Sequence, residues 1–127
     1  MRILLNVLTG LIAALHLWFL TLEMFLWQTP LGLRTFHRTA EQAADSAVLA
    51  ANQGLYNGFL AAGLVWSLLI GELRWALRVR AFFLGCILVA GIYGGVTAQR
   101  TILLVQALPA LVALIVLVLY QRASTAR

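Results

Sequence analysis

The long apolar runs of this chain limit its possible folds more than any other feature. A helix needs roughly 20 mostly apolar residues to cross the hydrocarbon core of a bilayer. Four segments of the 127-residue chain meet this need, namely residues 3–28, 47–70, 80–98 and 101–121. Charged residues make up 10% of the chain, against about 25% in a soluble domain. We therefore predict an all-α integral membrane four-helix bundle, with residues 1–127 forming a single transmembrane domain.

Local signals define the ends of the predicted helices. Pro30 and Gly32 are expected to end the first helix, which leaves residues 29–39 as the one real loop. Thr39 and Gln42 have the spacing of a capping box, so the second helix should begin before the membrane. A charged junction is expected between the second and third helices, with the residues Glu72, Arg74, Arg78 and Arg80. A tight hairpin is expected before the fourth helix, with the polar residues Gln99 and Arg100.

The arginines predict the orientation of the chain. All nine basic residues are arginines, and four spans place both termini on one side of the membrane. That side would carry Arg2, Arg74, Arg78, Arg80, Arg122 and Arg127, and the other side Arg34, Arg38 and Arg100. Because cytoplasmic loops are enriched in basic residues, both termini are predicted to be cytoplasmic. The arginines sit at helix ends and form no continuous basic stripe, which argues against nucleic-acid binding.

One stripe of the first helix carries polar residues. At 100° per residue, Thr9, His16, Glu23 and Trp27 fall within about 40° of one another. Glu23 has three interpretations: a functional group facing the bundle, a structural hydrogen bond, or a side chain that reaches the interface. His16 suits a structural hydrogen bond better than proton transfer or ligation. His16 and Glu23 lie two turns apart, about 10 Å, so no metal site and no cofactor is predicted.

The second helix is predicted to have three different faces. Asn52, Gln53, Tyr56 and Asn57 share one polar arc. Small residues form a packing face, which consists of Gly54, Gly58 and Ala62. Large apolar residues form a face assigned to lipid, which consists of Val48, Leu55, Phe59 and Trp66. Interhelical hydrogen bonding would explain one or two of the polar residues. Four of them favour a polar cavity.

Polar groups of all four helices are expected at one depth, in the outer leaflet. Gly91 and Gly95 of the third helix have GxxxG spacing, and Pro109 should bend the fourth helix. With the termini inside, the inner half is apolar apart from His16. The predicted outer pocket has Glu23 and Arg100 as charge partners, and its residues are Glu23, Asn52, Gln53, Tyr56, Asn57, Tyr93, Arg100 and Gln106.

Three segments resemble a known family. The stretch Val48-Leu-Ala-Ala-Asn-Gln-Gly-Leu-Tyr-Asn-Gly-Phe-Leu-Ala-Ala-Gly-Leu-Val-Trp66 is similar to the signature of the bacterial domain-of-unknown-function 1304 membrane proteins. Leu22-Glu-Met-Phe-Leu-Trp27 and Leu104-Val-Gln-Ala-Leu-Pro-Ala110 resemble the same family. The resemblance implies a small four-helix protein of the bacterial inner membrane, and it implies no activity.

Three functions are compatible with these features. The leading hypothesis is a membrane protein that binds or transports a small amphipathic or cationic molecule in the outer pocket, with binding coupled to protonation of Glu23. A homodimer packed through the Gly54/Gly58 or Gly91/Gly95 face is expected, because the chain is small for a transporter. The alternatives are an intramembrane enzyme that uses Glu23 as acid or base, and an accessory subunit of a larger membrane complex.

Overall fold

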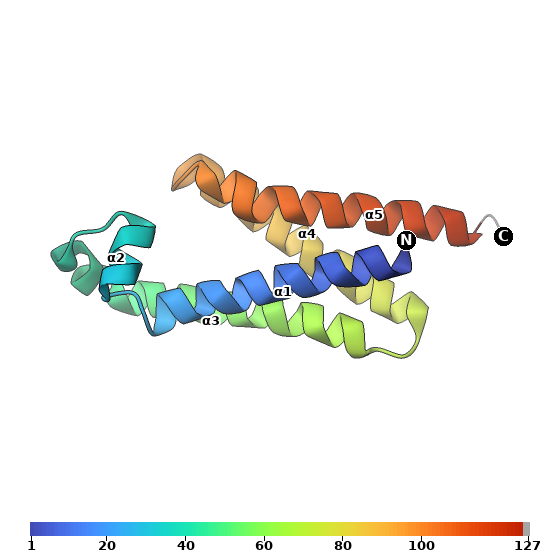
Figure 1. Cartoon of the computed structure of the whole chain (residues 1–127), viewed down its shortest axis with the longest axis horizontal. Coiled ribbons are helices and arrows are strands. Elements are labelled where there is room, and N and C mark those ends of the chain that lie inside the picture. Colours follow the sequence, from blue (N-terminus) through green and yellow to red (C-terminus); the bar gives the residue numbers. More distant parts are fainter. Residues whose placement is uncertain (126–127) are drawn as a thin grey trace. The chain divides into compact units, whose positions relative to one another are not determined.

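The fold is known from a computed structural model that describes residues 1–125. Over these residues the secondary structure is helical and contains no strand, so the all-α prediction is confirmed. The elements are α1 (Arg2–Met24), α2 (Pro30–Phe36), α3 (Ala40–Leu69), α4 (Leu73–Thr97), the π-helical segment η1 (Leu103–Ala107) and α5 (Leu108–Thr125) (Figure 1). Arg127, one of the arginines used to predict orientation, lies outside the described residues.

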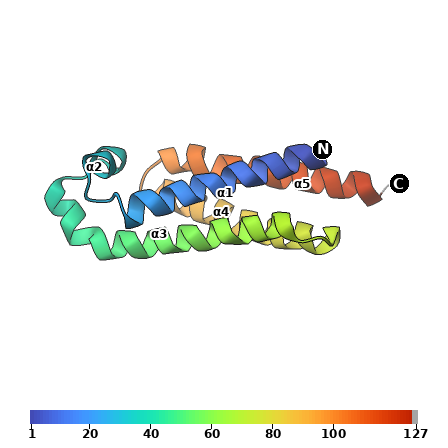
Figure 2. The ribbon, with the colours of Figure 1, turned by 60° about the horizontal axis from the view of Figure 1, so that its bottom comes forward.

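The contacts divide the chain into two compact units. The central unit is Ala14–Ala61, and the terminal unit joins Met1–Ala13 to Ala62–Arg127. In the central unit, the second half of α1 lies beside α3, and α2 follows at the end of this pair (Figure 2). In the terminal unit, α4 packs against η1 and α5. The assignment of all 127 residues to a single domain stays a prediction.

Three helices are long and apolar enough to cross a membrane, which is consistent with a membrane protein. They are Arg2–Met24, Leu73–Thr97 and Leu103–Ser124. The second of the four predicted spans is also helical, since α3 has 30 residues and includes nearly all of it. Its polar arc, Asn52 to Asn57, makes α3 less apolar than the other three. The crossing of the membrane by α3 therefore stays a prediction.

The segment between α1 and α3 contains a helix that the sequence analysis missed. The predicted loop over residues 29–39 is wrong, because Pro30–Phe36 form α2. Thr29 caps this helix by accepting a hydrogen bond from the Gly32 N–H, and Pro30 fits its first turn, where no N–H is needed. Pro30 therefore starts α2 rather than ending α1. The first helix has already ended at Met24, four residues before the predicted end at 28.

Side-chain caps mark the starts of α3 and α4. The predicted capping box is confirmed: the Gln42 N–H donates to Thr39 Oγ1 over 3.2 Å, and the Thr39 N–H donates to Gln42 Oε1 over 3.1 Å. The Glu72 carboxylate caps α4 by accepting from the backbone N–H groups of Arg74 and Trp75. The predicted start at 80 is therefore too late. Arginine is a good helix former, so the junction arginines extend α4 instead of interrupting it.

The fourth predicted span begins with a π-helical turn. In η1 the Leu108 N–H donates to the carbonyl of Leu103, five residues earlier. Pro109 follows directly; it has no N–H, and its ring would crowd the carbonyl of Val105 in a regular α-helix. Widening the turn ahead of the proline relieves that crowding. Pro109 thus changes the local helix type.

The expected tight hairpin at Gln99-Arg100 is confirmed by the short break after Thr97.

Both small-residue faces pack within the chain. In the central unit, Gly54 and Gly58 approach α1 so closely that a Cβ on either would lie 2.6 Å from a side-chain atom of Met24 or Leu20. In the terminal unit, a Cβ on Gly91 would lie 2.7 Å from the backbone nitrogen of Ala107. These faces are therefore covered by helices of the same chain. The predicted homodimer, which relied on them, stays a prediction with no face assigned.

Candidate functional site

Glu23 and Asn57 form the centre of the candidate site in the central unit. Glu23 lies near the end of α1 and is partly buried, and Asn57 lies in α3 with 7% of its surface exposed. Asn57 Nδ2 donates a hydrogen bond to Glu23 Oε2 over 2.7 Å, and a longer one to the Gln53 carbonyl. Gly54 makes this contact possible, since a Cβ there would lie 3.1 Å from Glu23 Cβ. The predicted inward orientation of Glu23 is consistent with this bond.

The other residues of the polar arc have exposed side chains. Asn52 and Gln53 are exposed, and Tyr56 is 56% exposed with its ring edge-on to Phe59. The four residues thus share one arc of α3, as predicted, but Asn57 alone of the four is buried. The arc spans about 140°, more than a single neighbouring helix covers. A shared pocket of Glu23 with Asn52, Gln53 and Tyr56 stays a prediction.

Three predicted site residues belong to the terminal unit. Gln106 lies in η1 and donates to the Ile87 carbonyl of α4 over 3.4 Å, which pairs the π-helical turn with α4. Tyr93 is 71% exposed on α4, and Arg100 is exposed in the short break that follows. The hypothesis that these three residues share a pocket with Glu23 stays a prediction, as does the Glu23–Arg100 charge pair.

The polar stripe of α1 faces protein along most of its length. Thr9 and His16 are fully buried, and Thr9 donates to the carbonyl of Leu5. The His16 ring packs edge-on to Phe19, with ring centroids 5.7 Å apart. Trp27 continues the stripe beyond the helix and donates to the Ala43 carbonyl and Ser46 Oγ. A hydrogen-bonding and packing role therefore explains most of this stripe without a ligand.

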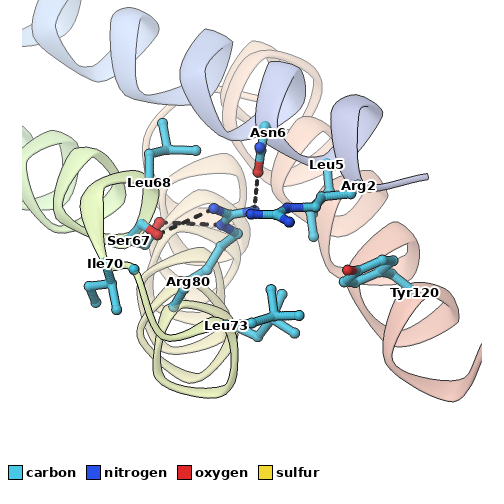
Figure 3. Close-up of a pocket in the computed structure, with 12 residues that line it drawn as sticks. Arg2, Leu5, Asn6, Ser67, Leu68, Ile70, Leu73, Arg80 and Tyr120 are labelled. Carbon is cyan, nitrogen blue, oxygen red and sulfur yellow. Dashed lines mark hydrogen bonds between the residues drawn. The ribbon is translucent and has the colours of Figure 1, made fainter. Parts of the chain in front are cut away.

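A second polar cluster, in the terminal unit, was missed by the sequence analysis. Arg80 has 4% of its surface exposed, and its guanidinium donates to Asn6 Oδ1, Ser67 Oγ and the Ser67 carbonyl (Figure 3). The expectation that the inner half is almost purely apolar except for His16 did not include this cluster, and it stays a prediction. Asn6 and Ser67 are polar residues within otherwise apolar helical runs, and this signal could have revealed the cluster.

The described residues contain few groups that commonly bind metal ions, and these are scattered along the chain. Across residues 1–125 no three His, Cys, Asp or Glu side chains come together in a way that could hold a metal ion. Cys86 is a partly buried free thiol in α4. At the candidate site, the carboxylate of Glu23 accepts a hydrogen bond from the amide of Asn57.

Comparisons with known proteins identify the family of the chain. The family model described as "Protein of unknown function (DUF1304)" matches residues 10–118. The chain is also similar to the uncharacterized protein YpaA of Lactococcus lactis subsp. lactis (strain IL1403), with 33% identity over 117 residues, covering 91% of this chain and 97% of YpaA. No solved structure matches the chain. Because the family model matches most of its length, the chain belongs to the DUF1304 family of proteins of unknown function.

Proposed function

We propose that this chain is a small membrane protein that binds or transports a small cationic or amphipathic molecule at a site built on Glu23. The observation that carries the proposal is the 2.7 Å hydrogen bond from Asn57 Nδ2 to Glu23 Oε2 between α1 and α3. An ionisable side chain within a spanning helix is costly and is found mainly where it serves a function. One amide donor orients the carboxylate but leaves its negative charge to attract a cation.

The proposed site extends outward from this pair. The exposed residues next to Asn57 on α3, Asn52, Gln53 and Tyr56, offer amide and phenol groups to a ligand that reaches Glu23. The exposed aromatic rings of Tyr56 and Phe59 suit an amphipathic ligand. Such rings pack against the apolar part of a ligand, and their faces attract a positive charge. Proton binding at Glu23 would compete with cation binding and could couple the two.

The proposed location is the bacterial inner membrane, with both termini cytoplasmic. Arg2 at the start of α1, Arg80 near the start of α4 and Tyr120 near the end of α5 line one cavity of the terminal unit. This convergence supports an even number of crossings, which requires α3 to span the membrane with α1, α4 and α5. The six-to-three arginine split then favours the cytoplasm for the termini.

Cysteine labelling is expected to place the α1–α3 and α3–α4 connections on opposite sides. The background variant is Cys86→Ala, and each test variant adds one cysteine, either Phe36→Cys in α2 or Gly71→Cys between α3 and α4. Gly71 is exposed, and a Cβ there meets no atom within 4 Å. A membrane-impermeant maleimide applied to intact cells should label the first variant and spare the second until the cells are opened. Labelling of Gly71→Cys, but not of Phe36→Cys, in intact cells would reverse the proposed orientation.

Glu23→Gln is expected to weaken binding of a lipophilic cation by at least about tenfold, since a neutral amide removes the attracting charge. The probe is tetraphenylphosphonium, measured by equilibrium dialysis against the full chain in detergent. Glu41→Gln is the matched control, because Glu41 is exposed in the first turn of α3. Equal affinities of the wild type and Glu23→Gln, or no saturable binding by the wild type, would contradict the proposed function.

The two alternative functions make different demands on the same variants. An accessory subunit would copurify with a partner in a fixed ratio, and that ratio would survive Glu23→Gln if Glu23 has no part in the contact. An intramembrane enzyme would keep cation binding in a variant that loses turnover. The exposed face of α3, with Val48 at 87% and Trp66 at 57% exposure, could be covered by either lipid or a partner.

A further inference from the structure

The terminal unit contains a small polar cavity around Arg80. The cavity measures about 40 Å³ and lies where the start of α1, the end of α3 and the first turns of α4 meet, with Tyr120 of α5 alongside (Figure 3). This volume exceeds what one water molecule needs. Arg2 and Asn6 are exposed, so the cavity can be reached from the surface of the unit. None of these residues belongs to the candidate site around Glu23.

Within residues 1–125, Arg80 has no negatively charged partner for its hydrogen bonds in this cavity. Its three hydrogen bonds go to neutral oxygens: Asn6 Oδ1 at 2.9 Å, Ser67 Oγ at 3.3 Å and the Ser67 carbonyl at 3.4 Å. The described residues that line the cavity include no carboxylate. Glu72, just before α4, uses its carboxylate to cap that helix. A buried charge is costly unless it is paired, and neutral acceptors leave the charge in place.

Arg2 brings a second positive charge to the same space. Both arginines line the cavity (Figure 3), and like charges repel each other. Two like charges beside one small cavity are unfavourable, since Arg80 is buried and solvent screens its charge poorly. A single anion between Arg2 and Arg80 would offset both the repulsion and the burial of Arg80.

The remaining donors of Arg80 suit an oxyanion. A guanidinium carries five N–H donors, and the three bonds to Asn6 and Ser67 use one on Nε and one on each Nη. Each Nη therefore keeps one N–H, and such planar pairs match the oxygens of a phosphate group. Tyr120 turns its phenol oxygen toward the side of the cavity where Arg2 lies (Figure 3).

We propose that the Arg80 cavity binds a phosphate group, with Arg80 and Arg2 as its cationic ligands. The phosphate group belongs either to a lipid headgroup or to a small soluble phosphate. Arg80 lies about 10 Å along α4 from Leu73, a depth that fits the headgroup layer if the first turn of α4 projects from the membrane. The site is independent of the function proposed for Glu23.

The test is isothermal titration calorimetry on the full chain in dodecyl maltoside. The probes are inorganic phosphate and dioctanoyl phosphatidylglycerol, with dioctanoylglycerol as the lipid that lacks phosphate. Saturable binding of either phosphate probe is expected, with at least about tenfold weaker binding in Arg80→Gln and in Arg2→Gln. Arg78→Gln is the control, because Arg78 lies on the same helix, is exposed, and stacks on Trp75 instead of lining the cavity.

The outcomes separate the sources of the phosphate. Binding of both probes in mutual competition supports recognition of the phosphate group itself, and binding of the lipid alone supports a headgroup site. The proposal would be overturned if dioctanoylglycerol bound as tightly as dioctanoyl phosphatidylglycerol. It would also be overturned if both arginine variants bound the phosphate probes as the wild type does, or if the wild type bound neither phosphate probe. If Arg80→Gln does not fold, Arg2→Gln decides the matter, because Arg2 is exposed and makes no helix-to-helix hydrogen bond among those the described residues show.

Discussion

Gly91→Leu is expected to lower the free energy of unfolding by about 3 kcal/mol, because it forces new atoms into a closed contact. A Cβ at Gly91 would lie 2.7 Å from the backbone nitrogen of Ala107 and 3.0 Å from its Cα. These are backbone atoms of η1, so no side-chain rotation can make room. The substitution must therefore push α4 and η1 apart and break the contact that also holds the Gln106–Ile87 hydrogen bond.

Gly85→Leu is the matched control on the same helix. A Cβ at Gly85 meets no atom within 4 Å, so leucine there gains helix propensity at little steric cost. Unfolding is measured by titrating the detergent-solubilised protein with sodium dodecyl sulfate and following the fluorescence of its four tryptophans. If the two variants unfold at the same detergent composition, close packing at Gly91 contributes nothing to stability and the interpretation fails.

Asn57→Leu is expected to destabilise the protein by about 1–2 kcal/mol, which is large for a single hydrogen bond in a membrane protein. Leucine has the same number and branching of side-chain heavy atoms as asparagine, so it keeps the overall shape and removes the hydrogen-bond donor. The Glu23 carboxylate would lose its 2.7 Å donor while staying partly buried. The cost is therefore the penalty for leaving a polar group without a partner, more than the strength of the bond itself.

Two comparisons test this explanation. Asn52→Leu changes an exposed member of the same polar arc and should leave stability nearly unchanged. The double variant Glu23→Leu with Asn57→Leu removes both polar groups and should recover most of the stability that Asn57→Leu loses. The same detergent titration applies to each. A double variant that is less stable than Asn57→Leu would show that Glu23 contributes through another contact.

Helix positions were largely predictable because the cost of placing backbone in lipid makes apolar runs helical. All four runs are helical, and the capping pair Thr39 and Gln42 marks the start of α3 directly. The errors arose where one residue type serves two purposes. Proline both ends helices and starts them, so Pro30 was assigned to the wrong helix terminus. Arginine marks membrane interfaces and also favours helix, so the sequence predicts a break at Arg74 and Arg78 where α4 in fact continues.

The candidate site was only partly predictable because periodicity relates residues of one helix and says nothing about its neighbours. The 100° rule correctly grouped Asn52, Tyr56 and Asn57, but it did not tell which of them would meet α1. The small residue Gly54 next to Asn57 decided this by allowing a close approach. Arg80 was missed for a related reason: its partners Asn6 and Ser67 lie on other helices, 74 and 13 residues away.

The hydrogen bonds of Arg80 also bear on how the chain enters the membrane during synthesis. Residues emerge from the ribosome in order, and both partners of Arg80, Asn6 on α1 and Ser67 on α3, precede it. An arginine that enters lipid without partners carries an insertion penalty of up to about 3 kcal/mol. By the time α4 reaches the translocon, the acceptors that lower this penalty have already been made. We therefore expect the order of the helices to assist insertion of α4, and a circular permutant that begins at α4 to insert less efficiently.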